Sequence, residues 1–343
     1  MDRKYLVTAV ALAALAGCES DEFCSIGTCP LPGSVGGGPT GSGGTAVLTS
    51  DNAVTALREG WFAATATADV PFFVVATGIG DTSGGLAGQP GVASKVAPGI
   101  RIQADPFGPD TYNCPVSGTF TVMGDVADPN TVTTDDYAEY SSSACDSGTG
   151  FTVDGDHRID ILQVVGDPNS GSYEQTQTLT FGDWMAADQT TTVTLSGDHT
   201  GTIDSTASNN VSMSFSGNSL IIGEGNLSIT IQTYGGFVSA DTVSPFDTSL
   251  SGTGIASSSA VQGSLEYEFP ETFMKPIGEP PTDGIFAVLG NGSTARVSVV
   301  DQTLVRVQLD GNNSGNFEIS VDTTWDDFLN GTIDLTTAIP VGE

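Results

Sequence analysis

A short stretch near the C-terminus carries the side-chain pattern that comes nearest to a metal site. Its oxygen-bearing residues are Asp310, Asn312, Ser314, Asn316 and Glu318. Side chains at alternate positions of a tight loop can converge on one cation, and Gly315 at the sixth position permits the sharp turn of a Ca²⁺ loop. The twelfth position holds Val321, so the bidentate acid is missing, although Asp322 follows. The spacing therefore predicts a weak Ca²⁺ site or, as the plainer alternative, a hairpin loop between two strands.

The rest of the chain lacks recognisable catalytic motifs. The only two histidines, His157 and His199, lie in or beside turn signals, so neither is expected to be a base in the core. The sequence has no Gly-x-Ser-x-Gly elbow, His-Glu-x-x-His zinc motif, phosphate-binding loop or dinucleotide fingerprint. We therefore predict that the protein is not an enzyme. A hydrolase that uses two of the 41 acidic residues remains an alternative.

The first residues have the layout of an export signal. Asp2, Arg3 and Lys4 precede an uncharged, mostly apolar run over residues 5–16. Its length of about 12 residues suits a signal peptide and is well short of the roughly 20 needed to span a bilayer. The run ends in Leu15-Ala16-Gly17-Cys18, which resembles the lipobox of bacterial lipoproteins. An ordinary signal peptide with a chance cysteine, or a core helix, would be the alternatives.

The resemblance implies that Cys18 is lipidated and becomes the first residue of the mature chain. Several acyl chains on one residue would anchor the protein stably, because a single chain holds only marginally. Glu19 follows the cysteine, which by the sorting convention of enteric bacteria suggests the outer membrane. The expected location is therefore the outer membrane or the cell surface. The membrane is the one partner that the sequence indicates, and a protein, glycan or lipid partner is left open.

The composition is that of an acidic β protein. Nine Lys and Arg oppose 41 Asp and Glu, for a formal net charge of −32. Such a charge disfavours binding to nucleic acid and to anionic membrane surfaces. The 44 glycines, the abundant Ser and Thr and the scarcity of long charged helix formers are typical of strands joined by turns.

The cysteine count fits an oxidising compartment. With Cys18 acylated, four cysteines remain: Cys24, Cys29, Cys114 and Cys145. Four cysteines allow three pairings, of which we favour the local ones, Cys24–Cys29 and Cys114–Cys145. The second bond would close a loop of about 30 residues, worth roughly 3–4 kcal/mol in the chain-entropy model.

The sequence divides into four expected segments. Residues 1–17 are the lipoprotein signal peptide, and residues 18–50 are the lipidated cysteine with a Gly-rich tether that cannot bury enough apolar surface to order itself. Residues 51–281 are an antiparallel β domain with an N-terminal helix over 51–66. Residues 282–343 are a C-terminal β extension of the same sheet.

A period of two dominates from about residue 101 onward. In 211–216, for example, Val211, Met213 and Phe215 alternate with three serines. One apolar and one wet face are typical of antiparallel sheets. The predicted strands are 70–77, 116–123, 158–165, 173–184, 190–196, 211–216, 227–233 and 264–269. Turns are predicted at 166–169, 197–198, 208–210, 217–218 and 223–226.

The C-terminal part shows a second, looser pattern. Strand-like runs at 285–289, 295–300, 303–309 and 317–321 precede a short helical turn that Thr324 can cap. The layout of Pro-x-x-Gly, a hairpin, an Asp-Gly-Asn turn and Thr-Thr-Trp resembles the C-terminal part of acidic bacterial lipoproteins of unknown function. This resemblance covers about 50 residues and implies no activity.

These patterns predict an all-β fold: a large antiparallel meander, curled as a sandwich or an open barrel, with one short helix packed on it. The expected core comprises Trp61, Phe73, Val75, Phe120, Val122, Ile161, Leu179, Phe181, Val193, Leu195, Phe215, Leu227, Ile229, Ile231, Val297, Val299, Val305, Val307, Leu309 and Trp325. The expected function is that of a lipid-anchored envelope protein with a binding or structural role. A carrier of an apolar ligand or lipid in the curled sheet is the first alternative.

Overall fold

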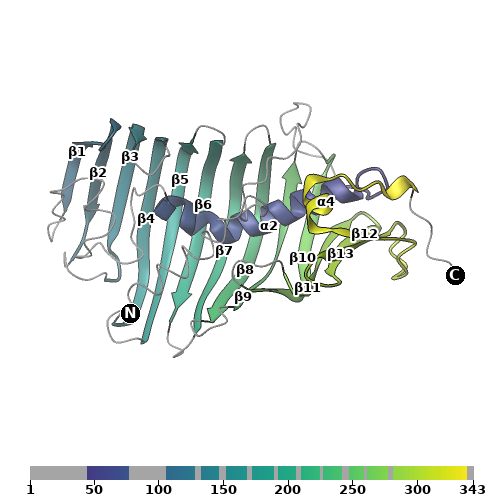
Figure 1. Cartoon of the computed structure of the whole chain (residues 1–343). Coiled ribbons are helices and arrows are strands. Elements are labelled where there is room, and N and C mark those ends of the chain that lie inside the picture. Colours follow the sequence, from purple (N-terminus) through teal and green to yellow (C-terminus); the bar gives the residue numbers. More distant parts are fainter. Residues whose placement is uncertain are drawn as a thin grey trace. The chain divides into compact units, whose positions relative to one another are not determined.

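The computed structural model describes eleven stretches of the chain. They are residues 45–76, 106–127, 133–146, 152–167, 172–188, 192–205, 210–224, 227–241, 247–258, 261–276 and 281–337. Strands make up most of these residues, which confirms the all-β prediction (Figure 1).

Within these described stretches, fourteen antiparallel strands form one open meander, in which the order of strands in the sheet is their order in the sequence. The strands are β1 (Phe107–Asn113), β2 (Ser117–Asp125), β3 (Tyr137–Asp146), β4 (Thr152–Asp167), β5 (Ser172–Ala187), β6 (Thr192–Asp204), β7 (Asn210–Glu224), β8 (Leu227–Asp241), β9 (Asp247–Ser258), β10 (Ser264–Pro276), β11 (Asp283–Gly290), β12 (Ser293–Val299), β13 (Leu304–Asp310) and β14 (Ile319–Thr324). The helices are α2 (Ala53–Ala76), α4 (Trp325–Asn330) and a 3-10 turn at Leu335–Thr337. Of these strands, β1, β3 and β9 were not predicted from the sequence.

The chain divides into two compact units. Among the described residues, the first unit runs from Asp69 to the end of β7, and the second comprises residues 45–68 and everything from β8 onward. Most of α2 therefore belongs to the second unit. Strand β10 pairs with β11, so the sheet of the second unit continues past the proline-rich segment before residue 282.

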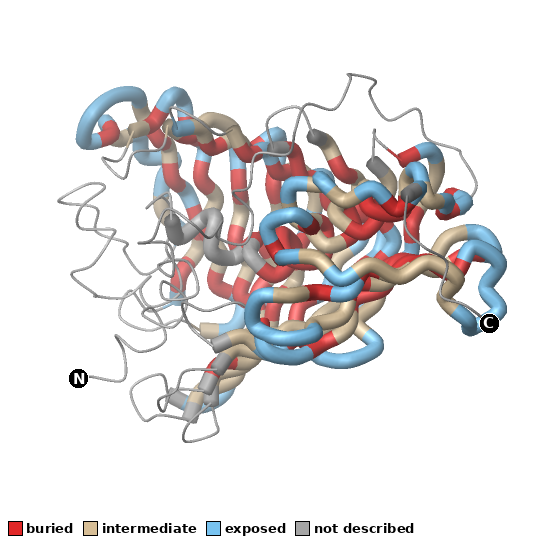
Figure 2. The backbone as a smooth tube through the Cα atoms, turned by 45° about the vertical axis from the view of Figure 1, so that its right-hand side comes forward, coloured by how far each residue is buried: buried red, intermediate tan, exposed pale blue. Residues whose placement is uncertain are grey.

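In the first unit the two faces of the sheet differ sharply. Buried and more exposed residues alternate along the strands (Figure 2). One buried row runs across four strands through Val122, Tyr140, His157 and Phe181. The opposite face carries Thr, Ser, Asp and Glu, as the period of two predicts for a half-buried sheet.

A line of β-bulges crosses the first unit. Gly155 on β4 has a φ of 90° and faces Asp183 on β5, whose φ is 50°. The same arrangement recurs where Gly118 meets Ala144 and where Gly197 meets Ser219. A Cβ on any of these three glycines would collide with the carbonyl of the facing residue. Only glycine fits, and each bulge locally bends its strand and increases its twist.

The bulges correct two predicted turns. Residues 197–198 lie inside β6 and residues 217–218 lie inside β7, so neither pair ends a strand. Glycine and Asn or Asp are typical of turns, but the same residues also supply the positive φ that a bulge needs. The strands are consequently longer than the sequence predicted; β4 and β5 have 16 residues each.

Helix α2 fills the buried face of the second unit. Its residues before Ala68 are buried on nearly all sides, as expected of a helix enclosed by other elements. The Trp61 ring lies 4.8 Å from Phe273, 5.5 Å from Phe286 and 6.1 Å from Trp325, measured between centroids. At Gly60 the helix comes so close to β11 that an added Cβ would lie 2.8 Å from Val288 Cγ2.

The predicted strand at 70–77 is wrong, because α2 continues to Ala76. The run Val-Pro-Phe-Phe-Val-Val has strand-like composition, but it follows a helix without a break, and composition alone does not separate a buried helix from a buried strand. No helix in the described part of the chain has both the length and the apolar character needed to cross a membrane.

The chain enters the second unit along β10 and β12. Ala46 N–H donates to the Ser264 carbonyl over 2.9 Å, and Leu48 N–H donates to Ser293 Oγ over 2.8 Å. Ala46 and Leu48 are both buried. The end of the segment predicted as tether therefore packs against the sheet.

The C-terminal hairpins agree with the sequence prediction. Strands β11 to β14 pair in order, and α4 follows at once. Thr324 caps α4, accepting a hydrogen bond at its Oγ1 from Asp327 N–H over 3.1 Å. Arg58 of α2 donates from Nε to the Leu329 carbonyl over 2.8 Å, which ties the two helices together.

Most of the predicted core is buried. Trp61 and Val299 are only partly buried, and the side chains of Phe73, Val75 and Leu227 lie outside what is described. The other predicted core residues are all buried. Alternation along the strands was therefore a sufficient guide to which face is inside.

Candidate functional site

The exposed face of the first unit presents aligned hydroxyl groups. Thr178 on β5 lies opposite Thr200 on β6, and their Oγ1 atoms are 3.0 Å apart. Thr176 and Thr202 form the next such pair at 2.9 Å. Hydrogen bonds across the strands hold these side chains in fixed positions. The rows continue on β7, where serines stand opposite the β6 threonines.

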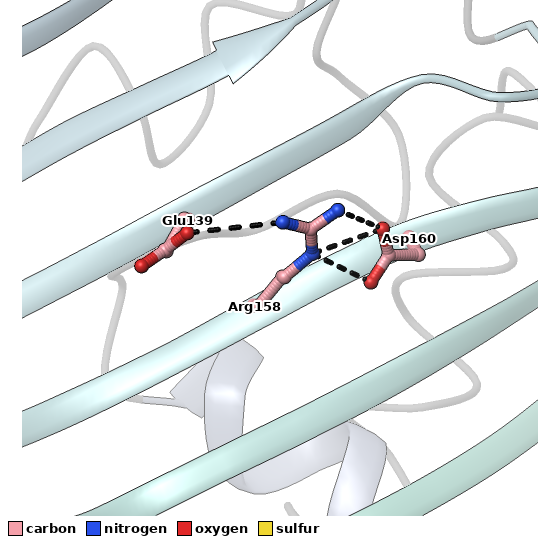
Figure 3. A network of polar contacts seen from close by, with 3 residues as sticks. All are labelled: Glu139, Arg158 and Asp160. Carbon is pink, nitrogen blue, oxygen red and sulfur yellow. Dashed lines mark hydrogen bonds and ion pairs between the residues drawn. The ribbon is translucent and has the colours of Figure 1, made fainter.

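The same face of the first unit carries a basic side chain, Arg158. Arg158 on β4 is the only Lys or Arg among the described residues of that unit. Its guanidinium lies between Glu139 on β3 and Asp160 on its own strand (Figure 3). The Nη1 to Glu139 Oε2 distance is 3.8 Å, and Nε and Nη2 donate to Asp160 over 2.6–3.0 Å.

An aromatic ring completes this cluster. The Cζ of Arg158 lies 4.2 Å from the centre of the Tyr137 ring, within cation–π distance. The hydrogen bonds to Asp160, and then the nearby negative charges, raise the pKa of Arg158 above its ordinary value. Arg158 and Glu139 remain more than a third exposed, so the ion pairs contribute little to stability. The cluster is a polar contact surface in which two carboxylates and an aromatic ring surround one guanidinium.

Sequence analysis did not single out these four residues. A signal was present, because Arg158 and Asp160 are two apart in a predicted strand and so share a face. The partners on β3 could not be found, since that strand and its register were not predicted.

The candidate Ca²⁺ loop is a connection between β13 and β14 that is held by its own backbone. The buried Asp310 carboxylate accepts hydrogen bonds from the N–H groups of Asn312, Ser314 and Gly315 over 2.7–3.2 Å. Glu318 Oε2 accepts one from Gly311 N–H over 2.9 Å. Asn312 Oδ1 and Ser314 Oγ also accept backbone N–H groups of the loop.

These bonds use the oxygens that a cation would need. Asn316 contributes through its backbone, donating to Ser314 and accepting from it. Within the described ranges, no three or more His, Cys, Asp or Glu side chains gather closely enough to hold a metal ion. The loop joins β13 and β14 as a hairpin connection, and the Ca²⁺ site stays a prediction.

The cysteines are accounted for in part. Cys114 and Cys145 form a disulfide with a Cα–Cα distance of 5.5 Å, which confirms that pairing. The bond joins the residue after β1 to β3 across a separation of 31 residues. Residues 15–18, Cys24 and Cys29 lie outside the described residues, so the lipidation of Cys18 and the Cys24–Cys29 bond stay predictions.

Both histidines lie in strands and not at turns, which corrects the sequence prediction. His157 on β4 and His199 on β6 are 1% and 0% exposed. His157 stacks on Tyr140 at 4.8 Å and His199 stacks on Phe215 at 5.8 Å. Burial lowers the pKa of His157 to about 4, against a smaller opposing effect of Asp156, and lowers that of His199 to about 3. Both rings are neutral at pH 7.

No protein-family model, no curated protein and no solved structure matches this chain.

Proposed function

We propose that this chain is a lipid-anchored envelope protein that acts by binding through the exposed face of its first unit, and that it is not an enzyme. The observation that carries the proposal is the contrast between the two faces of that unit. Aligned hydroxyls and carboxylates occupy the exposed face, whereas both histidines stand on the buried one. A neutral, enclosed imidazole is poorly placed to serve as a base for an external substrate.

The chemistry of the exposed face favours an uncharged partner rich in hydroxyls, such as a polysaccharide of the envelope. Thr and Ser hydroxyls both donate and accept, and carboxylates accept from sugar hydroxyls. The net charge of −32 argues against nucleic acid and against anionic lipid headgroups. Holding the threonines in pairs reduces the side-chain entropy lost on binding.

The lipid anchor is part of the proposal. Residues 15–18 carry the lipobox pattern, and the proposed attachment through Cys18 would hold the protein at the outer membrane or the cell surface. Mass spectrometry of the protein extracted from its own membrane is expected to show acylated Cys18 as the first residue. An unmodified Cys18, or a chain that starts at Met1, would refute the anchor.

A substitution on the exposed face tests the binding proposal. Thr202→Arg places a bulky charge in the hydroxyl row of the first unit, and Thr253→Arg makes the same change on the exposed face of β9 in the second unit. Binding to polysaccharide from the cell's own envelope, measured by calorimetry, should weaken at least about tenfold for Thr202→Arg and stay unchanged for Thr253→Arg. Equal binding by both variants, or no binding by the unaltered protein, would refute the proposal.

We infer further that the loop from Asp310 to Glu318 keeps its shape without a cation. Its carboxylates and amide oxygens already accept backbone N–H groups, and Val321 stands where a bidentate acid would be needed. Calorimetry with millimolar Ca²⁺ should give no heat of binding. A saturable heat that Asp310→Asn abolishes would establish a Ca²⁺ site instead.

The carrier alternative has less support in the second unit, because α2 lies against the buried face of the sheet there. There the Trp61 ring and the backbone at Gly60 are in contact with the aromatic residues of β10 and β11. Space for an apolar ligand would require α2 to leave the sheet.

A further inference from the structure

Four aromatic rings form a belt on the buried face of the first unit. They come from three adjacent strands: Tyr140 on β3, His157 on β4, and Phe181 and Trp184 on β5. Neighbouring ring centroids are 4.8 Å apart from Tyr140 to His157, 6.5 Å from His157 to Phe181 and 5.9 Å from Phe181 to Trp184. The belt is buried, with Trp184 at 0% exposed and His157 at 1%.

Unmatched polar atoms gather at this belt. His157 Nδ1 and Nε2, Trp184 Nε1 and Ser142 Oγ are all shielded from solvent and make no hydrogen bond with any described residue. Ser142 lies two residues from Tyr140 on β3 and is paired with Gly155, two residues from His157 on β4. These four atoms therefore lie on three adjacent strands, β3, β4 and β5.

Such a concentration is not what a closed protein core tolerates. More than nine in ten buried polar groups in native proteins have a partner, and leaving one unmatched costs about 1–3 kcal/mol. Among its described residues, the second unit has two such atoms, Arg58 Nη2 and Trp325 Nε1, one on each of two helices. Arg58 also donates through Nε to the Leu329 carbonyl.

We propose that the buried face of the first unit binds a small uncharged amphiphile, whose apolar body lies on the aromatic belt and whose hydroxyl or carbonyl groups bond to His157, Trp184 and Ser142. The site does not depend on the exposed-face binding proposed above, since it uses the opposite side of the same strands.

The polar atoms define the chemistry of this ligand. Trp184 only donates, Ser142 donates and accepts, and a neutral imidazole offers one donor and one acceptor. The low pKa of His157 means that the ring stays neutral, so it has no cation to offer an anionic head group. The ring faces of Tyr140, Phe181 and Trp184 supply apolar contact. A molecule with an apolar tail or ring system and an uncharged hydroxyl or carbonyl end satisfies all three conditions.

Native mass spectrometry on the full-length protein tests the proposal first. The protein is extracted from its own membrane in mild detergent, and a parallel sample is exported with Cys18→Ser so that it never joins the membrane. A bound mass in both samples identifies a water-borne ligand, and a bound mass in the membrane sample alone identifies a membrane lipid. Both results support the site. No mass beyond the chain and its anchor in either sample overturns it.

Two variants then locate the ligand. His157→Phe and Trp184→Phe keep an aromatic ring and remove the polar edge. Each should weaken binding of monooleoylglycerol, used as an uncharged amphiphilic probe, by about tenfold, as expected for one lost hydrogen bond. His199→Phe, which alters a ring two strands away at β6, is the control and should leave probe affinity within about twofold.

The midpoint of thermal unfolding of the ligand-free protein shows whether the His157 nitrogens bond to a ligand or to another part of the chain. If the His157 nitrogens are matched only by ligand, His157→Phe should leave that midpoint unchanged or raise it, because the substitution removes unmatched polar atoms from a buried site. A lowered midpoint would mean that the chain itself bonds His157. A crystal structure with ordered water alone on His157 and Trp184 would overturn the proposal in the same way.

Discussion

The two units build their buried faces by different means. The second unit covers its strands with a helix, and Trp61 stacks among Phe273, Phe286 and Trp325. The first unit keeps polar groups on its buried face, including both histidines and a chain of hydrogen bonds from Tyr173 through Gln175 to Gln177. The helix occupies the buried face of the second unit, whereas the buried face of the first unit carries aromatic and polar side chains side by side.

The units also differ in how their strands bend. The first unit relies on the line of bulges in which Gly118, Gly155 and Gly197 face residues of positive φ. In the second unit, β8 to β11 also shift register, whereas β11 to β14 pair without a shift. Substitutions at matched positions can therefore test whether stability depends on backbone geometry in one unit and on packing in the other.

The largest effect is expected from Gly155→Ala. The new Cβ would collide with the Asp183 carbonyl, and residues that carry a Cβ rarely adopt a φ of 90°. We expect a loss of about 4 kcal/mol in the free energy of unfolding of the first unit, measured by denaturant titration. Gly182→Ala is the control, because its Cβ would lie 3.7 Å from Asp156 Cβ in ordinary contact. Equal losses for both variants would refute a specific role for the bulge.

Trp61→Ala should have nearly as large an effect on the second unit. Removing a ring that contacts four aromatic side chains leaves a cavity that the helix and sheet cannot fill. The expected loss is about 3 kcal/mol, in the lower part of the range for large aromatic residues because Trp61 is only partly buried. Trp61→Phe is the matched control and should lose less than half as much. If denaturant titration shows no change for Trp61→Ala, α2 does not hold the second unit together.

Mild acid should weaken the first unit selectively. The folded pKa values of His157 and His199, about 4 and about 3, lie below the ordinary value of 6.5. The unfolded chain therefore binds more protons between pH 6.5 and 4, so the free energy of unfolding falls as the pH falls through that window. Each unit of pKa difference corresponds to about 1.4 kcal/mol, and His157 alone contributes about 3 kcal/mol to the fall.

Thermal melts at pH 7 and pH 4.5 measure this effect. The second unit contains neither of the two histidines of the chain, so its transition should move much less over the same interval. His157→Phe should remove part of the shift in the first unit. An acid response that is the same in both units would mean that carboxylates, and not the buried imidazoles, set the pH dependence.

The smallest effect is expected at the exposed ion pairs. Arg158→Gln in the first unit and Arg306→Gln in the second each remove a guanidinium that bonds to a carboxylate, Asp160 or Asp322. Both sites are exposed, so each variant should change the free energy of unfolding by less than about 1 kcal/mol. Loss of polysaccharide binding by Arg158→Gln alone would place the Arg158 cluster in the contact surface. A large loss of stability in either variant would contradict the interpretation that these exposed ion pairs contribute little to the free energy of unfolding.

Much of the fold could be predicted and little of the candidate site. Alternation located most strands, the core rows and the C-terminal hairpins, because side chains of a strand point to opposite faces in turn. The Cys114–Cys145 bond was predicted from the number of cysteines and their separation in the sequence, and the structure contains it. The contact between Glu139 and Arg158 could not be foreseen, since it depends on the register of two strands that are 19 residues apart at these positions and on a strand that was not predicted.

The sequence by itself determined that this is an acidic, antiparallel β protein with one wet face and one apolar face, and residues 15–18 show a pattern that resembles a lipobox. The tertiary structure alone decided what its glycines and histidines do. The pair Gly197-Asp198 is typical of a turn. Only the facing carbonyl of Ser219 shows that Gly197 forms a bulge inside a strand. Because the strand continues through that bulge, His199 stays in the sheet and is buried, where a turn would have left it in solvent.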